Sequence, residues 1–325
     1  MKALVTGILG FVGSNLAERL SNDGNEVYGL IRRVASRNMD PVSKIMKDIT
    51  LISGDVTDYA STRNAIKATT PDVIIHLAAS SPVRDSFERP FEYQQANVLG
   101  TMNVAHSMLE LPDPSTRKLF VASTAEVYGL QEDKLLKETF LLKPSSPYAV
   151  SKAAADLYIQ MMFKAFDLHG SILRPANSYG RKFDTSFLIE YLVTQMLEGN
   201  DIYVGAPNSV RDYMYVDDHV NAYVLAINNS KADQQIFNVG TGTGVSNREV
   251  AELIAGKIGY DSKKIKYGVY PPGYPIRPSM SDQPYIVIDA TKIEKTLNWK
   301  PTFSLSTGID KTIAFFKEHM LAKKA

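Results

Sequence analysis

The sequence contains no cysteine, a single tryptophan, no excess of either charge and no long hydrophobic run. The missing cysteine excludes a disulfide framework, a thiol nucleophile and a cysteine-ligated zinc site, and it fits a reducing compartment. Lysine and arginine number 36 against 35 aspartate and glutamate, so a net charge of +1 offers no basic field to a nucleic acid. No stretch reaches the roughly 18 apolar residues that cross a bilayer. We expect no nucleic-acid partner, no membrane insertion and a cytoplasmic protein.

Histidine is also scarce, and the five histidines lack the spacing of metal ligands, so no metal site is predicted. The apolar segment 1–13 is too short and too interrupted by threonine and glycine for a signal peptide. His76 falls inside a predicted strand, where we expect a core or cofactor-edge position rather than a catalytic base.

Short apolar runs alternate with helix-period segments through the first half of the chain. This pattern predicts strands at 2–6, 26–32, 50–53, 73–77 and 118–122, and helices at 12–20, 59–68 and 93–109. Continuous Val, Ile and Leu runs suit strands buried on both faces, and strand–helix alternation indicates a parallel sheet. The predicted fold is α/β, a doubly wound Rossmann sheet that binds ligands at the carboxyl ends of its strands.

After about residue 175 the composition changes, with frequent proline, glycine, tyrosine and asparagine. The length of 325 residues allows one large domain or two smaller ones. We predict a dinucleotide-binding domain over 1–175 and a smaller, partly interleaved substrate domain over 176–325. A return to the main sheet is expected at about 210–245, and a strand at 235–239 and a helix at 247–258 are assigned to this return.

A glycine-rich loop with the sequence TGILGFVG follows the first predicted strand and opens the first predicted helix. Gly7 allows the tight turn, Gly10 lets the backbone approach a pyrophosphate, and Gly13 packs the helix on the strand. The helix N-terminus at Phe11 and Val12 offers N–H groups to phosphates. An ordinary glycine turn has the same composition, but the position between strand and helix favours a dinucleotide site.

The end of the second predicted strand bears on which dinucleotide binds. An NAD site carries an acid there, whereas this chain has Arg32 and Arg33, which can pair with a 2′-phosphate. Two solvated surface arginines are the alternative, and NAD stays possible, but the charge favours NADP. Further cofactor contacts are predicted after the third and fourth strands: Asp55, Val56, Ala78 and Ala79.

Tyr148 and Lys152 lie four positions apart after a predicted helix start, so they share one helix face. A nearby ammonium and an oxidised nicotinamide lower the pKa of a tyrosine from its ordinary value near 10. The tyrosine then becomes a usable base for alcohol oxidation by hydride transfer. A hydroxyl from Thr124 or Ser123, after the strand 118–122, is placed to hydrogen-bond the same substrate oxygen; hydrogen bonding to local backbone is the alternative.

The motifs TGILGFVG, GDVTD, HLAA, NVLGT, ASTAEVYG, SPYAVSK, RPANSYG, RDYMYVDD, FNVGTG and LNWKP appear in order over nearly the whole chain. On these motifs the sequence resembles the extended short-chain dehydrogenase/reductases that modify nucleotide sugars. The resemblance implies that Thr124, Tyr148 and Lys152 are catalytic, with Tyr148 and Lys152 also at the cofactor. It implies a nucleotide-diphosphate sugar as substrate and a homodimer or homotetramer. It further implies that five residues contact the substrate: Asn97, Ser123, Asn177, Arg211 and Arg277. For the two arginines, surface salt bridges are the alternative.

Glu126 bears on the reaction within this family. The resemblance implies that a glutamate two residues after the threonine removes the C5 proton in sugar 4,6-dehydratases, once C4 is a ketone, and that water then leaves C6. A glutamate that caps or salt-bridges near the strand end is the structural alternative. Some epimerases and decarboxylases of the family also carry an acid at this position.

Three details resemble GDP-mannose 4,6-dehydratases: the basic segment 32–38, the small Ala125 and the segments 276–278 and 297–301. Phe11 and Val12 instead resemble epimerases and reductases of 4-keto sugars. The leading hypothesis is a nucleotide-sugar 4,6-dehydratase, most like GDP-mannose 4,6-dehydratase, that uses NADP. The alternatives are a 4-epimerase of the UDP-glucose/UDP-galactose type, a 4-keto-6-deoxy sugar nucleotide reductase and a non-catalytic NADP-sensing scaffold.

Overall fold

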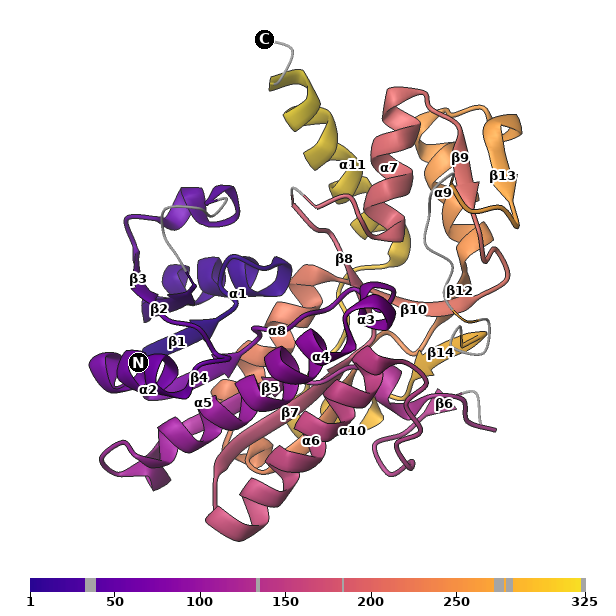
Figure 1. Cartoon of the computed structure of the whole chain (residues 1–325). Helices are drawn as coiled ribbons and strands as arrows, with labels where there is room; N and C mark the ends of the chain where they lie inside the picture. The colour runs from indigo at the N-terminus through magenta and orange to yellow at the C-terminus, as the bar shows by residue number, and fades with distance from the viewer. Residues whose placement is uncertain (33–38, 133–134, 183, 272–277, 279–282, 323–325) are drawn as a thin grey trace.

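Seven parallel strands form the centre of the larger domain (Figure 1). The computed structural model describes residues 1–32, 39–132, 135–182, 184–271, 278 and 283–322. The strand order confirms the predicted doubly wound sheet. In that order the strands are β11 (Gln235–Val239), β7 (His169–Pro175), β5 (Lys118–Ala122), β4 (Val73–His76), β1 (Lys2–Thr6), β2 (Glu26–Ile31) and β3 (Ile49–Ser53).

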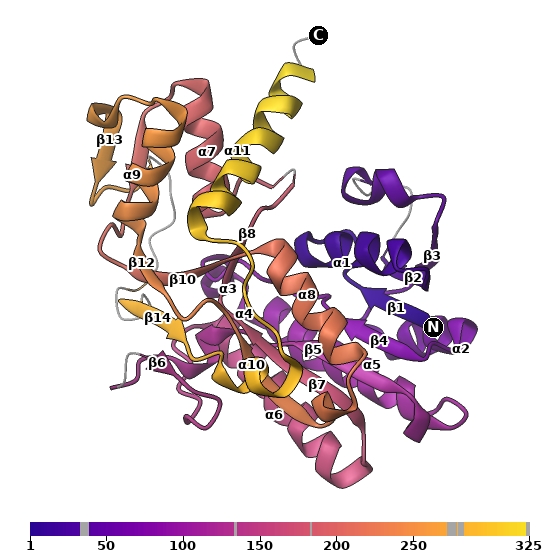
Figure 2. The same ribbon diagram turned by 180° about the vertical axis from the view of Figure 1, so that it is seen from behind.

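Helices cover both faces of this sheet because alternate strand residues point to opposite sides and both sides are apolar. Ala3 and Val5 face a core shared with α1 (Phe11–Asn22) and α8 (Val216–Ile227). Leu4 faces the opposite core, shared with α2 (Tyr59–Thr69), α5 (Gly100–Leu109) and α6 (Pro147–Phe166). Accordingly, α5 and α6 lie in front of the sheet in Figure 1, and α8 lies in front of it in Figure 2.

The two halves of the chain exchange elements. From the second half, α8 and β11 pack onto or into the large sheet, as the position of strand 235–239 predicted. From the first half, β6 (Leu135–Leu136) joins a smaller sheet in the order β12-β10-β14-β6, with β8 (Asn177–Tyr179) beside β10. The other strands of this sheet are β12 (Gly244–Ser246), β10 (Val210–Tyr215) and β14 (Tyr285–Ile288).

The smaller domain has its own core, formed by α7 (Leu188–Glu198), α9 (Asn247–Ile258) and α11 (Leu305–Ala322) around the strand pair β9 (Ile202–Val204) and β13 (Ile265–Tyr267). The assignment of helix 247–258 to the main sheet is therefore wrong. A capping box of Ser246 and Glu249 starts α9 directly after β12, and Val250 and Ile254 pack in the smaller core. The helix α10 (Thr291–Leu297) lies beside β11 instead.

The helix predicted over 93–109 is not continuous. The short helices α3 (Asp85–Glu88) and α4 (Pro90–Tyr93) precede a π-helical turn, Gln94–Leu99, and α5 follows it. A π turn shifts the helix register by one residue, and such turns are frequent at functional sites. Here it carries Asn97 into the interior, where that residue is 1% exposed.

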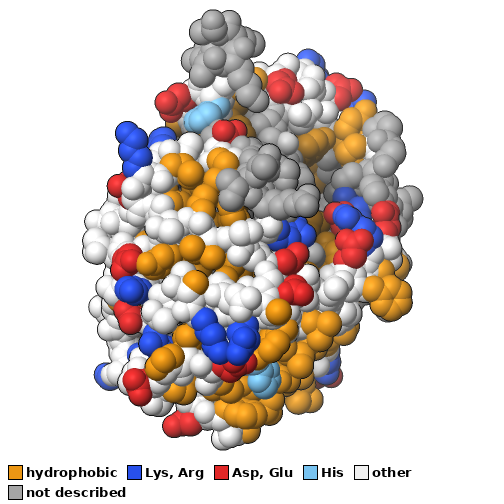
Figure 3. Space-filling model, turned by 60° about the vertical axis from the view of Figure 1, so that its left-hand side comes forward, with side chains coloured by type: hydrophobic (Ala, Val, Ile, Leu, Met, Phe, Trp, Pro, Cys, Tyr) orange, Lys and Arg blue, Asp and Glu red, His pale blue; other side chains and the backbone are white. Residues whose placement is uncertain are grey.

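The charge of one face, the apolar length of the helices and the grouping of metal-ligating side chains can be read from the described residues. On the face shown in Figure 3, the described Lys and Arg side chains are interspersed with Asp and Glu, without a broad basic area. Within the described ranges, no helix is long and apolar enough to cross a membrane. The same residues include no group of His, Asp and Glu that could hold a metal ion.

Candidate active site

The glycine loop is built for close approach of backbone to backbone. Gly7 has a φ of +71°, and a Cβ there would lie 2.8 Å from the backbone nitrogen of Ala78. A Cβ on Gly13 would lie 2.2 Å from the carbonyl oxygen of Gly7. Helix α1 begins after Gly10 without a side-chain cap, so its first N–H groups remain for a ligand. These contacts require glycine at 7 and 13 and present a helix N-terminus suited to phosphate.

His76 connects the glycine-loop strand β1 to helix α5. Its Nδ1 is 2.8 Å from Thr6 Oγ1 and its Nε2 is 3.1 Å from Thr101 Oγ1. Burial lowers the pKa of His76 to about 3, and the charge of Lys152 adds to the effect. The imidazole is neutral and fully bonded, which confirms the prediction of a core residue rather than a base.

The other predicted cofactor residues lie along the same edge of the large sheet. Arg32 directly follows β2 and is exposed, whereas Arg33 lies outside the described residues. The carboxylate of Asp55 is oriented by Thr57, which donates from N (3.0 Å) and Oγ1 (2.9 Å). Two more of these residues are half-buried, Val56 and Ala78, and Ala79 is exposed. Helix α1 begins with Phe11 and Val12, which pack partly against the core on that face of the sheet.

Tyr148 and the strand-end hydroxyls converge at the start of α6. Ser146 caps this helix by accepting from the backbone N–H of Ala149 (3.1 Å), as predicted for the helix start. Burial raises the pKa of Tyr148 above its ordinary value, and a hydrogen bond with Thr124 opposes that shift. Ser123 is 4% exposed, and its Oγ has no hydrogen-bond partner within the part of the chain that the structure describes.

Two cations, Lys152 and Arg181, belong to this part of the structure, and they differ in what they contact. The buried Lys152 ammonium donates to the Ala122 carbonyl oxygen, and burial lowers its pKa to about 8. The Arg181 guanidinium lies 3.5 Å from the Phe187 ring centre and 4.4 Å from that of Phe11. The charge of Arg181 lowers the pKa of Tyr148. Arg181 therefore joins the segment after β8 to the start of α1, beside the tyrosine.

Glu126 stands two residues beyond Thr124 in the same turn, and Thr124 Oγ1 accepts its backbone N–H at 3.3 Å. Its carboxylate raises the pKa of Tyr148, so the two side chains are close enough to interact electrostatically. The Oε2 atom accepts a hydrogen bond from Nε2 of Gln283 at 3.1 Å. The structure thus brings Thr124, Glu126 and Tyr148 together at the end of β5.

Asn97 is buried at the site, and its side chain hydrogen-bonds to neighbouring protein groups. Its Oδ1 accepts from Ser80 N (2.8 Å), and its Nδ2 donates to Ser80 O (3.0 Å) and Ser151 Oγ (2.8 Å). Both amide protons are used and the residue is 1% exposed. The assignment of Asn97 to substrate contact is thus not what this geometry supports; the side chain braces the π turn against α6.

The predicted substrate residues on the smaller sheet are neighbours. Arg211 lies on β10 and is 8% exposed, and one of its contacts is a hydrogen bond to the Val210 carbonyl (2.9 Å). Asn177 is exposed on β8 and pairs with Tyr213 of β10. Arg277 lies outside the described residues. The sheet therefore brings Asn177 and Arg211 onto adjacent strands.

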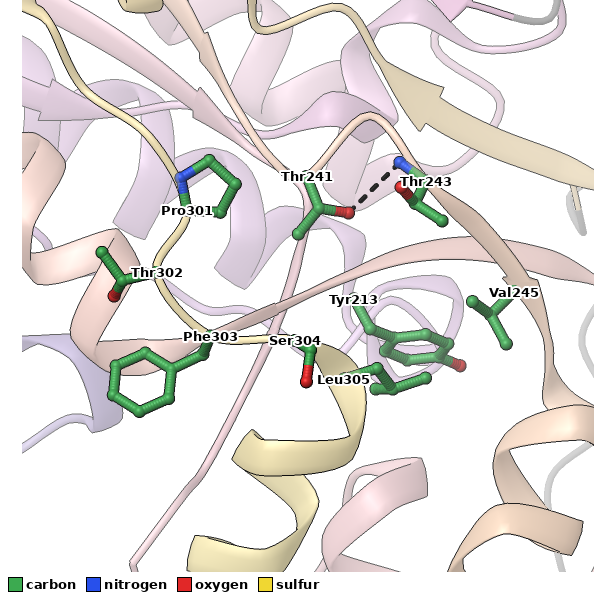
Figure 4. A pocket seen from close by; sticks show the side chains of 9 residues that line it. All are labelled: Tyr213, Thr241, Thr243, Val245, Pro301, Thr302, Phe303, Ser304 and Leu305. Atoms are coloured by element: carbon green, nitrogen blue, oxygen red, sulfur yellow. Dashed lines mark hydrogen bonds between the residues drawn. The ribbon is translucent and has the colours of Figure 1, made fainter.

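A separate cavity of about 350 Å³ lies in the smaller domain, and Figure 4 shows its lining. Hydroxyl groups and apolar side chains line it, with no charged side chain and none of the predicted site residues, so it does not suit a diphosphate. The lining residues are Tyr213, Thr241, Thr243, Val245, Pro301, Thr302, Phe303, Ser304 and Leu305.

Two residues at the site, Arg181 and Gln283, escape sequence reasoning. Arg181 directly follows the RPANSYG motif, and a basic residue beside a family motif is the one signal that points to it. Gln283 has no such signal, because its contact with Glu126 joins positions 157 residues apart.

Comparison with known proteins agrees with the fold. Residues 4–312 match the family model described as GDP-mannose 4,6 dehydratase. The chain is 33% identical to a UDP-glucose 4-epimerase of Mycolicibacterium smegmatis, covering 98% of this chain and 99% of the relative. A UDP-glucose 4-epimerase from Thermotoga maritima, solved with UDP-glucose, has a TM-score of 0.88 at 27% identity, covering 98% and 100% of the two chains. A dTDP-glucose 4,6-dehydratase from Streptomyces venezuelae, solved with NAD, has a TM-score of 0.87 at 26% identity, covering 98% and 97%.

Proposed function

Because this chain belongs to the extended short-chain dehydrogenase/reductase family of NAD(P)-dependent nucleotide-sugar dehydratases and epimerases, we propose that it is a nucleotide-sugar 4,6-dehydratase. One observation carries the choice of reaction: the Glu126 carboxylate, held by Gln283, lies beside Tyr148 and Thr124. A dehydratase needs such a base near the oxidised carbon, in addition to the groups that all members need for oxidation. GDP-mannose is the first substrate to test, since the matched family model bears that description.

The residues present fit a dinucleotide. Gly7 and Gly13 leave room where a Cβ would clash, the N-terminus of α1 has no side-chain cap, and the buried Oγ of Ser123 lacks a partner among the described residues. The chemistry that the dinucleotide supplies when bound is reversible hydride uptake from the sugar. Gly10, Phe11 and the other cofactor residues of the sheet edge would hold it.

Proton transfers fall to the chain's own side chains. Tyr148 takes the proton of the sugar O4 hydroxyl, and Thr124 hydrogen-bonds the same oxygen. The resulting C4 ketone makes the C5–H bond acidic, and Glu126 takes that proton. As the C6–O bond breaks, the proton passes from Glu126 to the departing oxygen, which leaves as water. The hydride taken up from C4 would then be returned to C6 while C5 takes up a proton, so the product is a 4-keto-6-deoxy sugar and the reaction has no net oxidation. Lys152, fixed on the Ala122 carbonyl, and Asn97, fixed on Ser80 and Ser151, hold α6 and the π turn in place.

A panel of sugar nucleotides tests the reaction. Purified protein is incubated with GDP-mannose, UDP-glucose, UDP-galactose and dTDP-glucose, and the products are analysed by mass spectrometry. Loss of one water from one of them is the expected result. An unchanged mass with inverted stereochemistry at C4 contradicts the dehydratase proposal, and bound nucleotide without turnover of any sugar favours a scaffold.

A 4-epimerase is the second candidate, favoured by one specific observation. A relative named UDP-glucose 4-epimerase is 33% identical to this chain, whereas a relative named as a probable dTDP-glucose 4,6-dehydratase is 30% identical. Tyr148, Thr124 and Lys152 serve an epimerase equally, because it too begins with oxidation at C4. Epimerisation at C4 does not require the Glu126 carboxylate.

Arg32 is proposed to select NADP. Its exposed side chain follows β2, where an acid would recognise the ribose of NAD. We expect Arg32→Asp to lower the ratio of kcat/KM for NADP over NAD by about 10- to 100-fold, the size of a lost charged hydrogen bond. Arg32→Lys, which keeps the charge, should retain most of the preference. An unchanged ratio in Arg32→Asp contradicts this role.

Arg181 is proposed to favour the phenolate of Tyr148. Because a cation lowers the pKa of a neighbouring tyrosine, its removal in Arg181→Met should move the rising limb of the kcat/KM–pH profile to higher pH. Activity at neutral pH falls several-fold and recovers as the pH is raised. Phe187→Leu removes the ring contact but keeps the charge, so its limb should stay in place. Identical limbs in Arg181→Met and the wild type contradict the proposal.

We expect a homodimer that forms through α6. Val150, Leu157 and Met161 lie on one face of this helix and are 44%, 54% and 38% exposed. Leu157→Lys should convert the dimer to a monomer in light scattering, while Val269→Lys, the same kind of change at a 49% exposed apolar residue outside α6, should not. Equal masses for Leu157→Lys and the wild type contradict this interface.

A further inference from the structure

Gln283 is a buried amide that reaches from the smaller sheet to the proposed base. It is 3% exposed, and its Nε2 donates to Glu126 Oε2 at 3.1 Å and to Ser145 Oγ at 3.2 Å. The orientation of the amide follows from chemistry, because a carboxylate accepts hydrogen bonds and would repel the amide oxygen. Both Nε2 protons are therefore committed, one to Glu126 and one to Ser145, which lies three residues before Tyr148.

The other end of the amide is unused. The Oε1 atom of Gln283 is buried without a hydrogen-bond partner among the residues that the structure describes. Buried polar atoms are nearly always bonded, and a buried acceptor without a donor is unfavourable, so each exception requires an explanation. Because Nε2 is bonded to Glu126, the amide cannot rotate to bring Oε1 to another donor. The donor to Oε1 must therefore come from outside the described residues.

The position of Gln283 ties this acceptor to the substrate side. The next residue, Pro284, accepts the backbone N–H of Val210 at 2.9 Å, and Ile286 pairs with Arg211 across β14 and β10. Gln283 thus lies two residues before β14, which pairs with the strand of Arg211 and contacts the turn that carries Glu126. A sugar that reaches from Arg211 to Glu126 would therefore pass the amide.

We propose that Gln283 is a positioning residue for Glu126 and that its Oε1 accepts a hydrogen bond from a hydroxyl of the substrate sugar. The first part rests on the proposed dehydratase function, because it concerns Glu126 as a base. The second part needs only a sugar nucleotide as substrate. A donor to the carboxylate favours its charged form, so Gln283 keeps Glu126 ready to accept the C5 proton. A sugar hydroxyl on Oε1 then fixes the amide and, through it, the base.

Gln283→Met keeps the length of the side chain and removes both interactions. Loss of the donor raises the pKa of Glu126, so the acid limb of the kcat profile for water loss should move to higher pH. We expect kcat at neutral pH to fall about 10- to 100-fold, within the range of general base catalysis. KM for the sugar nucleotide should rise as well, because the hydroxyl loses its acceptor.

Gln195→Met is the matched control, because Gln195 also donates its amide Nε2 to a carboxylate, Glu198 Oε2 at 3.2 Å, on α7 outside the proposed site. Its pH profile and KM should equal those of the wild type. Thermal melting and dinucleotide binding show whether each variant folds. If Gln283→Met does not fold, Gln283→Glu replaces it: a second carboxylate beside Glu126 should move the same limb to higher pH.

The outcomes separate the two proposals. A wild type that changes stereochemistry without losing water ends the dehydratase proposal and with it the role of Gln283 toward Glu126. In that case KM for the epimerised sugar still tests the hydroxyl contact, and an unchanged KM in Gln283→Met overturns it. A wild type that loses water, with a variant whose acid limb does not move, overturns the positioning role alone.

Discussion

Replacing Glu126 with glutamine should lower the rate of water loss from the sugar nucleotide by about a thousandfold, within the range for loss of a general base. The substitution keeps the size of the side chain and its capacity to accept from Gln283, so the geometry of the turn is retained. Oxidation at C4 does not need this carboxylate. Single-turnover absorbance of the reduced nicotinamide should therefore persist while mass spectrometry detects almost no dehydrated product.

Glu138→Gln provides the control for this substitution. Glu138 is another half-buried glutamate on a loop, and its Oε1 accepts the backbone N–H of Asn238 at 2.9 Å, away from Tyr148. It should dehydrate the sugar nucleotide at the wild-type rate. Full dehydration by Glu126→Gln would mean that another group removes the C5 proton. Equal loss of oxidation and dehydration would show that Glu126 acts before the elimination.

Removing Arg174 should destabilise the fold by about 3–5 kcal/mol, the usual cost of leaving one partner of a buried ion pair uncompensated. Arg174 on β7 donates from Nε and Nη2 to both carboxylate oxygens of Asp156 on α6, at 2.8 and 2.9 Å. The two residues are 2% and 1% exposed. In Arg174→Met the Asp156 charge stays buried without its cation, and urea denaturation should show the loss.

Two further variants separate the ion pair from packing. Arg174→Met with Asp156→Leu removes both charges and should recover most of the lost stability, since apolar pairs of similar volume replace such bridges well. Arg19→Met breaks an exposed pair with Asp23 and should cost about 0–1 kcal/mol. A double variant as unstable as Arg174→Met would assign the effect to Arg174's other contacts, from Nη1 to the Tyr128 hydroxyl at 2.9 Å and to the Glu138 carbonyl at 3.4 Å.

Arg174 and Asp156 also bear on the site, because they fix the helix that carries Tyr148 and Lys152 to the large sheet. The Tyr128 hydroxyl extends the network to Asn238 Oδ1 on β11 at 2.6 Å. The network thereby joins α6, β7, β11 and the turn after β5 that carries Thr124 and Glu126. Burying these polar groups costs free energy. We infer that they are kept because they position the site with a directional precision that an apolar contact does not supply.

Most of the large sheet follows from local sequence. The strands at 2–6 and 118–122 have the predicted bounds, and the strands at 26–32 and 73–77 end one residue earlier. The prediction of a continuous helix at 93–109 is wrong because a π turn at Gln94–Leu99 interrupts it and buries Asn97. The periodicity of apolar residues does not show which turn of a helix will be a π turn. Helix 247–258 has its predicted bounds, but its packing partner is α7 rather than the main sheet.

The sequence by itself determined the features that depend on neighbours along the chain. These are the glycine turn after β1, the Ser146 cap that starts α6, and the turn that carries Thr124 and Glu126. Such features follow from steric limits and hydrogen bonds within a few residues. Tertiary structure alone decided which distant groups meet: Gln283 on Glu126, Arg181 on Phe11, and β6 beside β14. These contacts depend on how two domains exchange elements, and no local preference of the residues encodes them.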